Sequence, residues 1–200
     1  SLGKLISKRD YQTAHALIAC TLSKVTCLDP KKEVYDFLKD VHEYLRQLIK
    51  IYPSSEEAFN AVKELYGDCC RPFYESMIDS VLLNDFDSKQ FYDLKFNLIH
   101  QKILYSSLYD DRELQKLIYE RWTKYGLDLL IESGKEESVI LDYLSQYADS
   151  EAVQVNYVDY YVRKGHYQKA LDILDEHTGH AYEVKKQEVI DAMNHHKEVS

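Results

Sequence analysis

The stretch KGHYQKALDIL (residues 164–174) is echoed near the start of the chain by KRDYQTAHALI (residues 8–18). Both stretches read Lys-x-x-Tyr-Gln-x-Ala, and after two further residues both have a pair of aliphatic residues. In stacked helical hairpins a turn ends one helix, an aromatic side chain wedges into the pair, and a small alanine lets two backbones approach. The repeat therefore predicts an elongated α-solenoid of stacked antiparallel helix pairs.

The composition agrees with an all-helical chain. Hydrophobic residues make up 45% of the 200 residues, which is enough for a core. Six glycines and three prolines are too few for the many tight turns of a fold built from strands. Apolar residues recur at spacings of three and four, and turn residues interrupt them. We therefore expect an all-α fold of about ten to eleven helices.

Cap residues and helix breakers set the expected boundaries. Asp10 is an expected N-cap, and the run of residues 54–57 (Ser-Ser-Glu-Glu) is expected to start a helix. Pro30 and Pro72 are expected at first helical positions, and Gly126 and Gly134 are expected helix ends. The expected helices span residues 10–26, 30–52, 54–66, 72–82, 89–108, 110–126, 127–133, 136–148, 150–164, 166–177 and 181–197.

We interpret residues 1–200 as a single solenoid segment that is a fragment of a longer chain, because the sequence starts without methionine and its last amphipathic helix continues to the boundary uncapped. A repeat at a cut end has lost the neighbour that covers its apolar face. We therefore predict a partner or chain-continuation surface at the ends. Its residues are Leu2, Leu5, Ile6, Tyr182, Val189, Ile190 and Met193.

No pattern in the sequence identifies a reaction. Gly-x-Ser-x-Gly, a phosphate-binding glycine loop and a dinucleotide fingerprint are all missing from the sequence. His177 and His180 approach a metal-ligand spacing, but Gly179 interrupts the helix between them. We therefore interpret them as polar side chains at the rim of a loop and not as metal ligands. We expect no enzyme activity, no catalytic residues, no cofactor, no metal and no small-molecule substrate.

Charge and cysteine content restrict the partners and the compartment. The net charge of −9 disfavours nucleic acid as a partner. Cys20 and Cys27 are interpreted as free thiols that pack as small hydrophobes, and the adjacent Cys69 and Cys70 are poorly placed to bond to each other. No apolar run approaches the roughly 18–20 residues that span a bilayer, and no signal peptide is visible. We expect a reducing, intracellular location.

The eighteen tyrosines are expected at the half-buried shoulders of helix pairs, where a flat apolar ring with a polar tip fits best. A surface that stacks single-stranded nucleic acid would need interleaved lysine or arginine, and residues 157–161 lie in an acidic stretch instead. Trp122 lies on an apolar helix face and is expected in the core.

A longer run of the chain resembles a known family. DRELQKLIYERW (residues 111–122) leads into Leu129-Leu130, then ILDYL (residues 140–144), YVDYYVRK (residues 157–164) and the opening stretch. This order of an aromatic helix, a dileucine, a short helix, a Tyr-Tyr helix and a Tyr-x-x-Ala-x-x-Ile-Leu helix resembles the C-terminal helical region of the large scaffold nucleoporins. In those proteins a β-propeller precedes an α-solenoid.

The resemblance implies a structural scaffold segment of the nuclear pore complex at the nuclear envelope. Such a segment would bind other large scaffold proteins and support protein and mRNA transport. Both the inner-ring branch and the outer-ring Y-complex branch of the family stay open. The same run also resembles the solenoids of vesicle coat and tethering complexes. The alternative from another class is a regulatory or catalytic helical domain, such as an exchange factor or a regulatory peptide-binding helical adaptor.

Overall fold

The computed structural model describes residues 1–199, and the side chains of all of these except Pro72, Phe73, Ala181 and residues 196–199. Within that range the chain forms eleven α-helices and three short 3-10 helices, and it contains no strand. The predicted all-α fold and the predicted number of helices are therefore confirmed.

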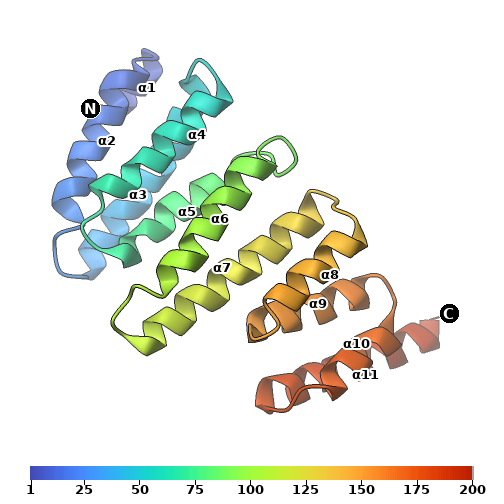
Figure 1. The fold of residues 1–200 in the computed structure, drawn as a ribbon. Coiled ribbons are helices and arrows are strands. Elements are labelled where there is room, and N and C mark those ends of the chain that lie inside the picture. Colours follow the sequence, from blue (N-terminus) through green and yellow to red (C-terminus); the bar gives the residue numbers. More distant parts are fainter. Residues whose placement is uncertain (200) are drawn as a thin grey trace. The chain divides into compact units, whose positions relative to one another are not determined.

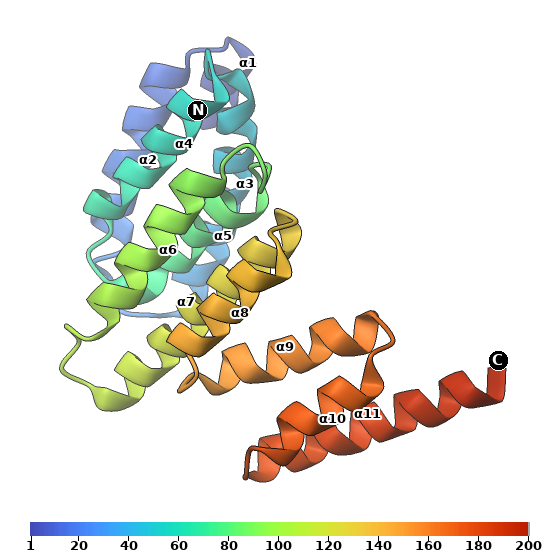
Figure 2. The ribbon, with the colours of Figure 1, turned by 45° about the vertical axis from the view of Figure 1, so that its right-hand side comes forward.

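The chain divides into two compact units, Ser1–Phe91 and Tyr92–Ser200. The first unit contains α1 (Leu2–Ser7), α2 (Tyr11–Val25), α3 (Lys32–Leu48), η1 (Ile49–Ile51), α4 (Ser55–Glu64), η2 (Leu65–Asp68), η3 (Pro72–Glu75) and α5 (Ser76–Asn84). The second contains α6 (Tyr92–Ser106), α7 (Arg112–Glu132), α8 (Glu137–Gln146), α9 (Glu151–Arg163), α10 (Tyr167–Asp175) and α11 (His180–Val199) (Figures 1 and 2). That these units form a single elongated segment stays a prediction.

The two echoed stretches form the same type of turn between two helices. Arg9 in the first turn has a φ of 57° and Gly165 in the second has a φ of 74°, so both backbones are left-handed. In each turn the next N–H donates to the carbonyl five residues earlier: Asp10 to Leu5 at 3.0 Å, and His166 to Tyr161 at 2.9 Å. This Schellman-type ending satisfies carbonyls that the helix leaves unpaired. The sequence repeat is therefore a structural repeat.

Side chains that follow the two turns occupy matching places. Tyr11 and Tyr167 are half-buried, whereas Ala14 and Ala170 are completely buried. The aliphatic residue four positions after each alanine is also buried. Since α1 packs on α2 and α9 packs on α10, each alanine lies where a larger side chain would be overpacked.

The left-handed residues of the two turns give a paired prediction. We expect Arg9→Gly to stabilise the first unit by about 1 kcal/mol and Gly165→Arg to destabilise the second by about 1–2 kcal/mol, because only glycine adopts this conformation without steric cost. Denaturant unfolding measures both changes. Gly67→Ala is the control, because Gly67 has no positive φ and no atom within 4 Å of an added Cβ. A destabilising Arg9→Gly substitution would count against the shared turn.

The structure confirms the predicted N-cap at Asp10 and the predicted helix start in residues 54–57, where Ser54 is the N-cap. The carboxylate of Asp10 accepts the N–H of Thr13 at 3.2 Å, and the hydroxyl of Ser54 accepts the N–H of Glu57 at 3.1 Å. These bonds satisfy donors that the first turn of each helix leaves free.

Two of the predicted boundaries are wrong. Pro30 lies outside α3, which begins at Lys32. Gly126 ends no helix, because α7 continues through it to Glu132 and replaces the two helices expected over residues 110–133. A Cβ atom at Gly126 would lie 2.0 Å from the hydroxyl oxygen of Tyr143. Gly126 therefore serves the packing of α8 on α7 and does not break the helix.

Several tyrosines bond through their hydroxyl ends to a neighbouring helix or turn. The Tyr143 hydroxyl donates to the carbonyl of Thr123 at 2.9 Å, and the Tyr66 hydroxyl donates to the carboxylate of Asp79 at 2.6 Å. Trp122 is buried as expected, with the Lys102 ammonium 5.8 Å from its ring centroid. In these tyrosines the apolar ring packs in the interior, and the hydroxyl forms a hydrogen bond to another element.

The raised pKa values of two half-buried phenols predict that the protein unfolds in alkaline solution. Burial raises the pKa of Tyr52 to about 12, and burial together with the charge of Asp79 raises the pKa of Tyr66 far above its usual range. In the unfolded chain both phenols ionise near pH 10, so the stability that they contribute is complete below pH 10 and is lost as the pH rises above it. Tyrosinate absorbance should therefore show a late group of phenols that ionise together with the loss of helical circular dichroism. Ionisation of every tyrosine while the helices persist would oppose this expectation.

Candidate interaction surfaces

Large apolar side chains are exposed around the turn between α6 and α7. The most exposed, Leu108, has 74% of its surface in solvent, and Leu117 has 57%. The full group comprises Leu104, Tyr105, Leu108, Leu114 and Leu117. The last turns of α6 and the first turns of α7 meet at this end of the hairpin (Figure 1). We call these five residues the hairpin-end group.

The turn between α6 and α7, around which the hairpin-end group lies, is held by several hydrogen bonds. Asp111 caps α7 by accepting the N–H groups of Glu113 at 2.9 Å and Leu114 at 3.2 Å. The side-chain amide of Gln115 donates to the carbonyl of Ser107 at 3.2 Å and also to that of Tyr109. The leucines therefore project from a fixed backbone. Exposed apolar side chains that gather at one end of a hairpin are candidates for a protein interaction site.

A polar depression of about 410 Å³ lies beside the same helices in the second unit. Its carboxylates are already used within the fold. Glu120 accepts the hydroxyl of Ser150 at 2.7 Å and the N–H of Ala152 at 2.8 Å, so it caps α9, and Asp149 accepts the hydroxyl of Tyr119 at 2.7 Å. We therefore assign these groups to the joint between α7 and α9.

The first unit contains a cavity of about 260 Å³ between α3 and the η3–α5 segment. It is lined by Tyr35, Leu38, Lys39, His42, Tyr74, Ser76, Met77 and Ser80. The rings of Tyr35 and Tyr74 contact each other, with centroids 5.7 Å apart. Small-molecule sites usually enclose roughly 300–1,000 Å³, so this cavity fits a single large side chain better than a cofactor.

His42 gives this cavity a polar feature. The Nε2 atom of His42 is buried, and it has no hydrogen-bond partner in the part of the chain that the structure describes. A buried ring nitrogen without a partner is unfavourable because it has lost water and gained nothing in exchange. A bound group with a complementary donor or acceptor would remove that penalty.

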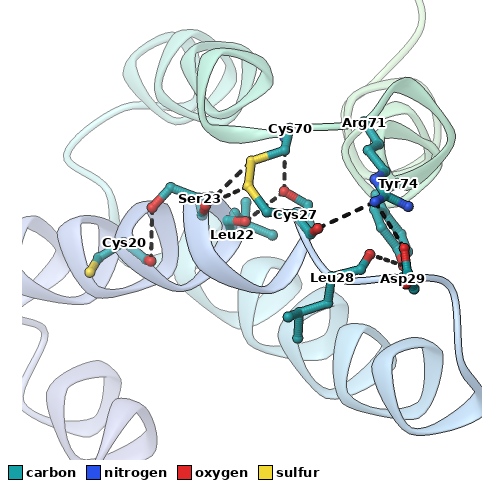
Figure 3. The surroundings of a disulfide bond; sticks show 10 residues. Cys20, Leu22, Ser23, Cys27, Leu28, Asp29, Cys70, Arg71 and Tyr74 are labelled. Carbon is teal, nitrogen blue, oxygen red and sulfur yellow. Dashed lines mark hydrogen bonds and ion pairs between the residues drawn. A yellow bond between two sulfur atoms is a disulfide. The ribbon is translucent and has the colours of Figure 1, made fainter.

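A disulfide joins Cys27 to Cys70 in the first unit, with their Cα atoms 5.1 Å apart (Figure 3). The interpretation of Cys27 as a free, packed thiol is therefore wrong. Cys20 is free but exposed, so it does not act as a small core hydrophobe either, whereas Cys69 is half-buried. The bonded residues are 43 positions apart, and no local spacing motif could reveal that pairing.

The predicted end residues fall into two groups on different units. Leu2, Leu5 and Ile6 belong to α1 and are half-buried, as are Tyr182, Ile190 and Met193 of α11. Val189 is 1% exposed, so it belongs to the internal packing of α11 and was wrongly included in an exposed surface. Its burial follows from the packing of α11 on α10 and α9. For the other six residues, a partner or chain-continuation surface stays a prediction.

The His177–His180 segment carries a ring contact. The His177 ring stacks on Tyr182 at 4.8 Å, and Gly179 has a φ of 137°. In the part of the chain that the structure describes, no three His, Cys, Asp or Glu side chains gather as metal ligands would.

Within residues 1–199, no helix combines the length and the apolar character that crossing a bilayer requires. Comparisons with protein-family models, with curated proteins and with solved structures found no match.

Proposed function

We propose that this chain is a helical scaffold segment that mediates protein–protein assembly. The observation that carries the proposal is the shared turn at residues 8–10 and 164–166, with a buried alanine after each copy. A repeat of this kind buries its apolar face only against a neighbouring repeat. Stacks of such repeats present extended surfaces to other proteins.

The finer proposal is a scaffold segment of the nuclear pore complex. It is supported by the resemblance of residues 111–174 to the helical region of the large scaffold nucleoporins. Several residues of that run, namely Trp122, Leu129, Leu130, Tyr157 and Tyr161, are buried in the second unit. Their burial makes them packing residues of a helical stack, which is the role that the resemblance implies for them. The proposed partners are other large scaffold proteins.

The hairpin-end group is the proposed contact surface for those partners. Removing the surface of one leucine from water contributes about 1.5–3 kcal/mol, and several leucines at the same end of the α6–α7 hairpin can contribute together. Burying a charge without a partner is strongly unfavourable, so substitution of one or two of these leucines by a charged residue should disrupt assembly.

Imaging in cells tests the proposal. The chain is produced with a fluorescent tag and compared with a double variant, Leu108→Glu with Leu117→Glu. Leu141→Glu is the matched control, because Leu141 is an exposed leucine of α8 in the same unit. We expect the wild type and the control to mark the nuclear rim and the double variant to spread through the cell. Wild-type signal on vesicle membranes would favour a coat or tethering complex, and diffuse wild-type signal would oppose both.

A peptide-binding adaptor is the second candidate, and the cavity beside His42 favours it. An adaptor would insert one large side chain of a peptide into the cavity and pair its polar end with Nε2 of His42. Ser80→Phe should fill the cavity and abolish binding of peptides selected from a library, whereas Leu141→Glu should not. Peptide binding that survives Ser80→Phe would exclude this site.

A further inference from the structure

We propose that the Cys27–Cys70 disulfide is a redox-responsive latch. In its closed form it fixes the segment Cys69–Glu75 on the C-terminal end of α2, and with it the cavity wall that this segment supplies. In its open form the segment is held by non-covalent contacts alone. This inference stands independently of the proposed function, since it concerns only contacts within the first unit.

Non-covalent contacts surround the disulfide and align its two cysteines. The N–H of Cys70 donates to the hydroxyl of Thr26 at 2.9 Å, and that buried hydroxyl donates to the carbonyl of Leu22 at 2.6 Å. The Arg71 guanidinium lies 3.1 Å from the carboxylate of Asp29 and 3.4 Å from the carbonyl oxygen of Cys27 (Figure 3). These contacts need no sulfur–sulfur bond, so they can keep the two thiols close after reduction.

The latch connects to the cavity through Tyr74. Four residues after Cys70, the Tyr74 hydroxyl donates to the carbonyl of Leu28 at 3.4 Å, and its ring packs on Tyr35. Tyr74 is nearly completely buried and lines the cavity beside His42. Because Cys70 anchors one end of this segment to α2, opening the disulfide is expected to loosen the wall that contains Tyr74.

The chemistry is ordinary thiol–disulfide exchange at exposed cysteines. Cys27 and Cys70 are both exposed, so a small thiolate can reach the bond. One glutathione thiolate attacks one sulfur and releases the other cysteine as a thiolate, which takes up a proton. A second glutathione then attacks the mixed disulfide. Glutathione disulfide leaves, and two electrons and two protons have passed to Cys27 and Cys70. Glutathione disulfide as oxidant reverses both steps.

The test measures whether the Cys27–Cys70 disulfide is open or closed in mixtures of reduced glutathione and glutathione disulfide. Free thiols are labelled with a maleimide and counted by mass spectrometry. We expect Cys27 and Cys70 to be unlabelled and joined to each other when the disulfide form is in excess, and all four cysteines to be labelled when the reduced form is in excess. Hydrogen exchange in residues 69–75 should be faster in the open form. The closed form should melt on the order of 10 °C higher, because the bond closes a long loop.

Variants separate a latch from a permanent structural bond. Cys27→Ser should match the reduced wild type in hydrogen exchange and melting temperature in every mixture, and Cys20→Ser should close the disulfide like the wild type. If Cys27→Ser does not fold, the reduced wild type supplies the same comparison. A bond that stays closed in excess reduced glutathione, or that never forms in excess glutathione disulfide, would overturn the proposal. Equal hydrogen exchange of residues 69–75 in the two forms would also overturn it.

Discussion

Replacing Phe59 by alanine is expected to lower the free energy of unfolding of the first unit by about 3–5 kcal/mol. Phe59 is 0% exposed, and its ring lies 5.1 Å from that of Phe86 and 5.5 Å from that of Phe91. Alanine would remove most of the apolar surface at this three-ring contact and leave a cavity, because the rigid helix α4 cannot move far enough to close it.

Phe37→Ala is the matched control, since Phe37 lies on α3 of the same unit with 44% of its surface exposed. That change should cost less than about 1 kcal/mol. Equilibrium denaturation with urea measures both values. Similar small losses for the two variants would mean that the Phe59 cluster is not the core of this unit.

The second large effect is expected at Gly126, where valine should destabilise the second unit by about 3 kcal/mol through overpacking. A Cβ atom at this position would lie 2.0 Å from the hydroxyl oxygen of Tyr143 and 2.6 Å from its Cζ atom. The ring must then move, and the hydrogen bond from Tyr143 to the carbonyl of Thr123 is lost. The better helix propensity of valine offsets less than about 1 kcal/mol of this cost.

A double-mutant cycle isolates the cause of this loss. In a Tyr143→Ala background, Gly126→Val should no longer destabilise the protein, because the opposing ring is missing. The two single losses would then add up to much more than the loss of the double variant. Strict additivity would show that Gly126 is needed for some reason other than its contact with Tyr143.

The helices were predictable because the sequence pattern and the local chemistry agree. Asp10 and Ser54 cap the helices that follow them, and apolar spacing of three and four marks the buried faces. Gly126 misled the prediction, since a glycine that ends a helix and a glycine that admits a neighbouring ring look the same in a sequence. The difference lies in Tyr143, which is far away in the chain and close in space.

The candidate surfaces could not be predicted from the sequence as well as the helices could. Leu108 and Leu117 fit an apolar pattern as well as buried leucines do, and only the packed structure shows that solvent reaches 74% and 57% of their surfaces. The disulfide was missed because Cys27 and Cys70 meet through the packing of α2 against the η2–η3 loop. Val189 was assigned to an open face because an amphipathic last helix looks the same whether or not a neighbour covers it.

The claim that the chain assembles with scaffold proteins is tested most directly by quantitative affinity purification from cells. The wild type, the Leu108→Glu and Leu117→Glu double variant and the Leu141→Glu control are compared under identical conditions. The proposal predicts that large scaffold proteins of the nuclear pore are enriched with the wild type and the control, and are lost with the double variant. Recovery of the same proteins with all three chains, or of no scaffold proteins with the wild type, would contradict it.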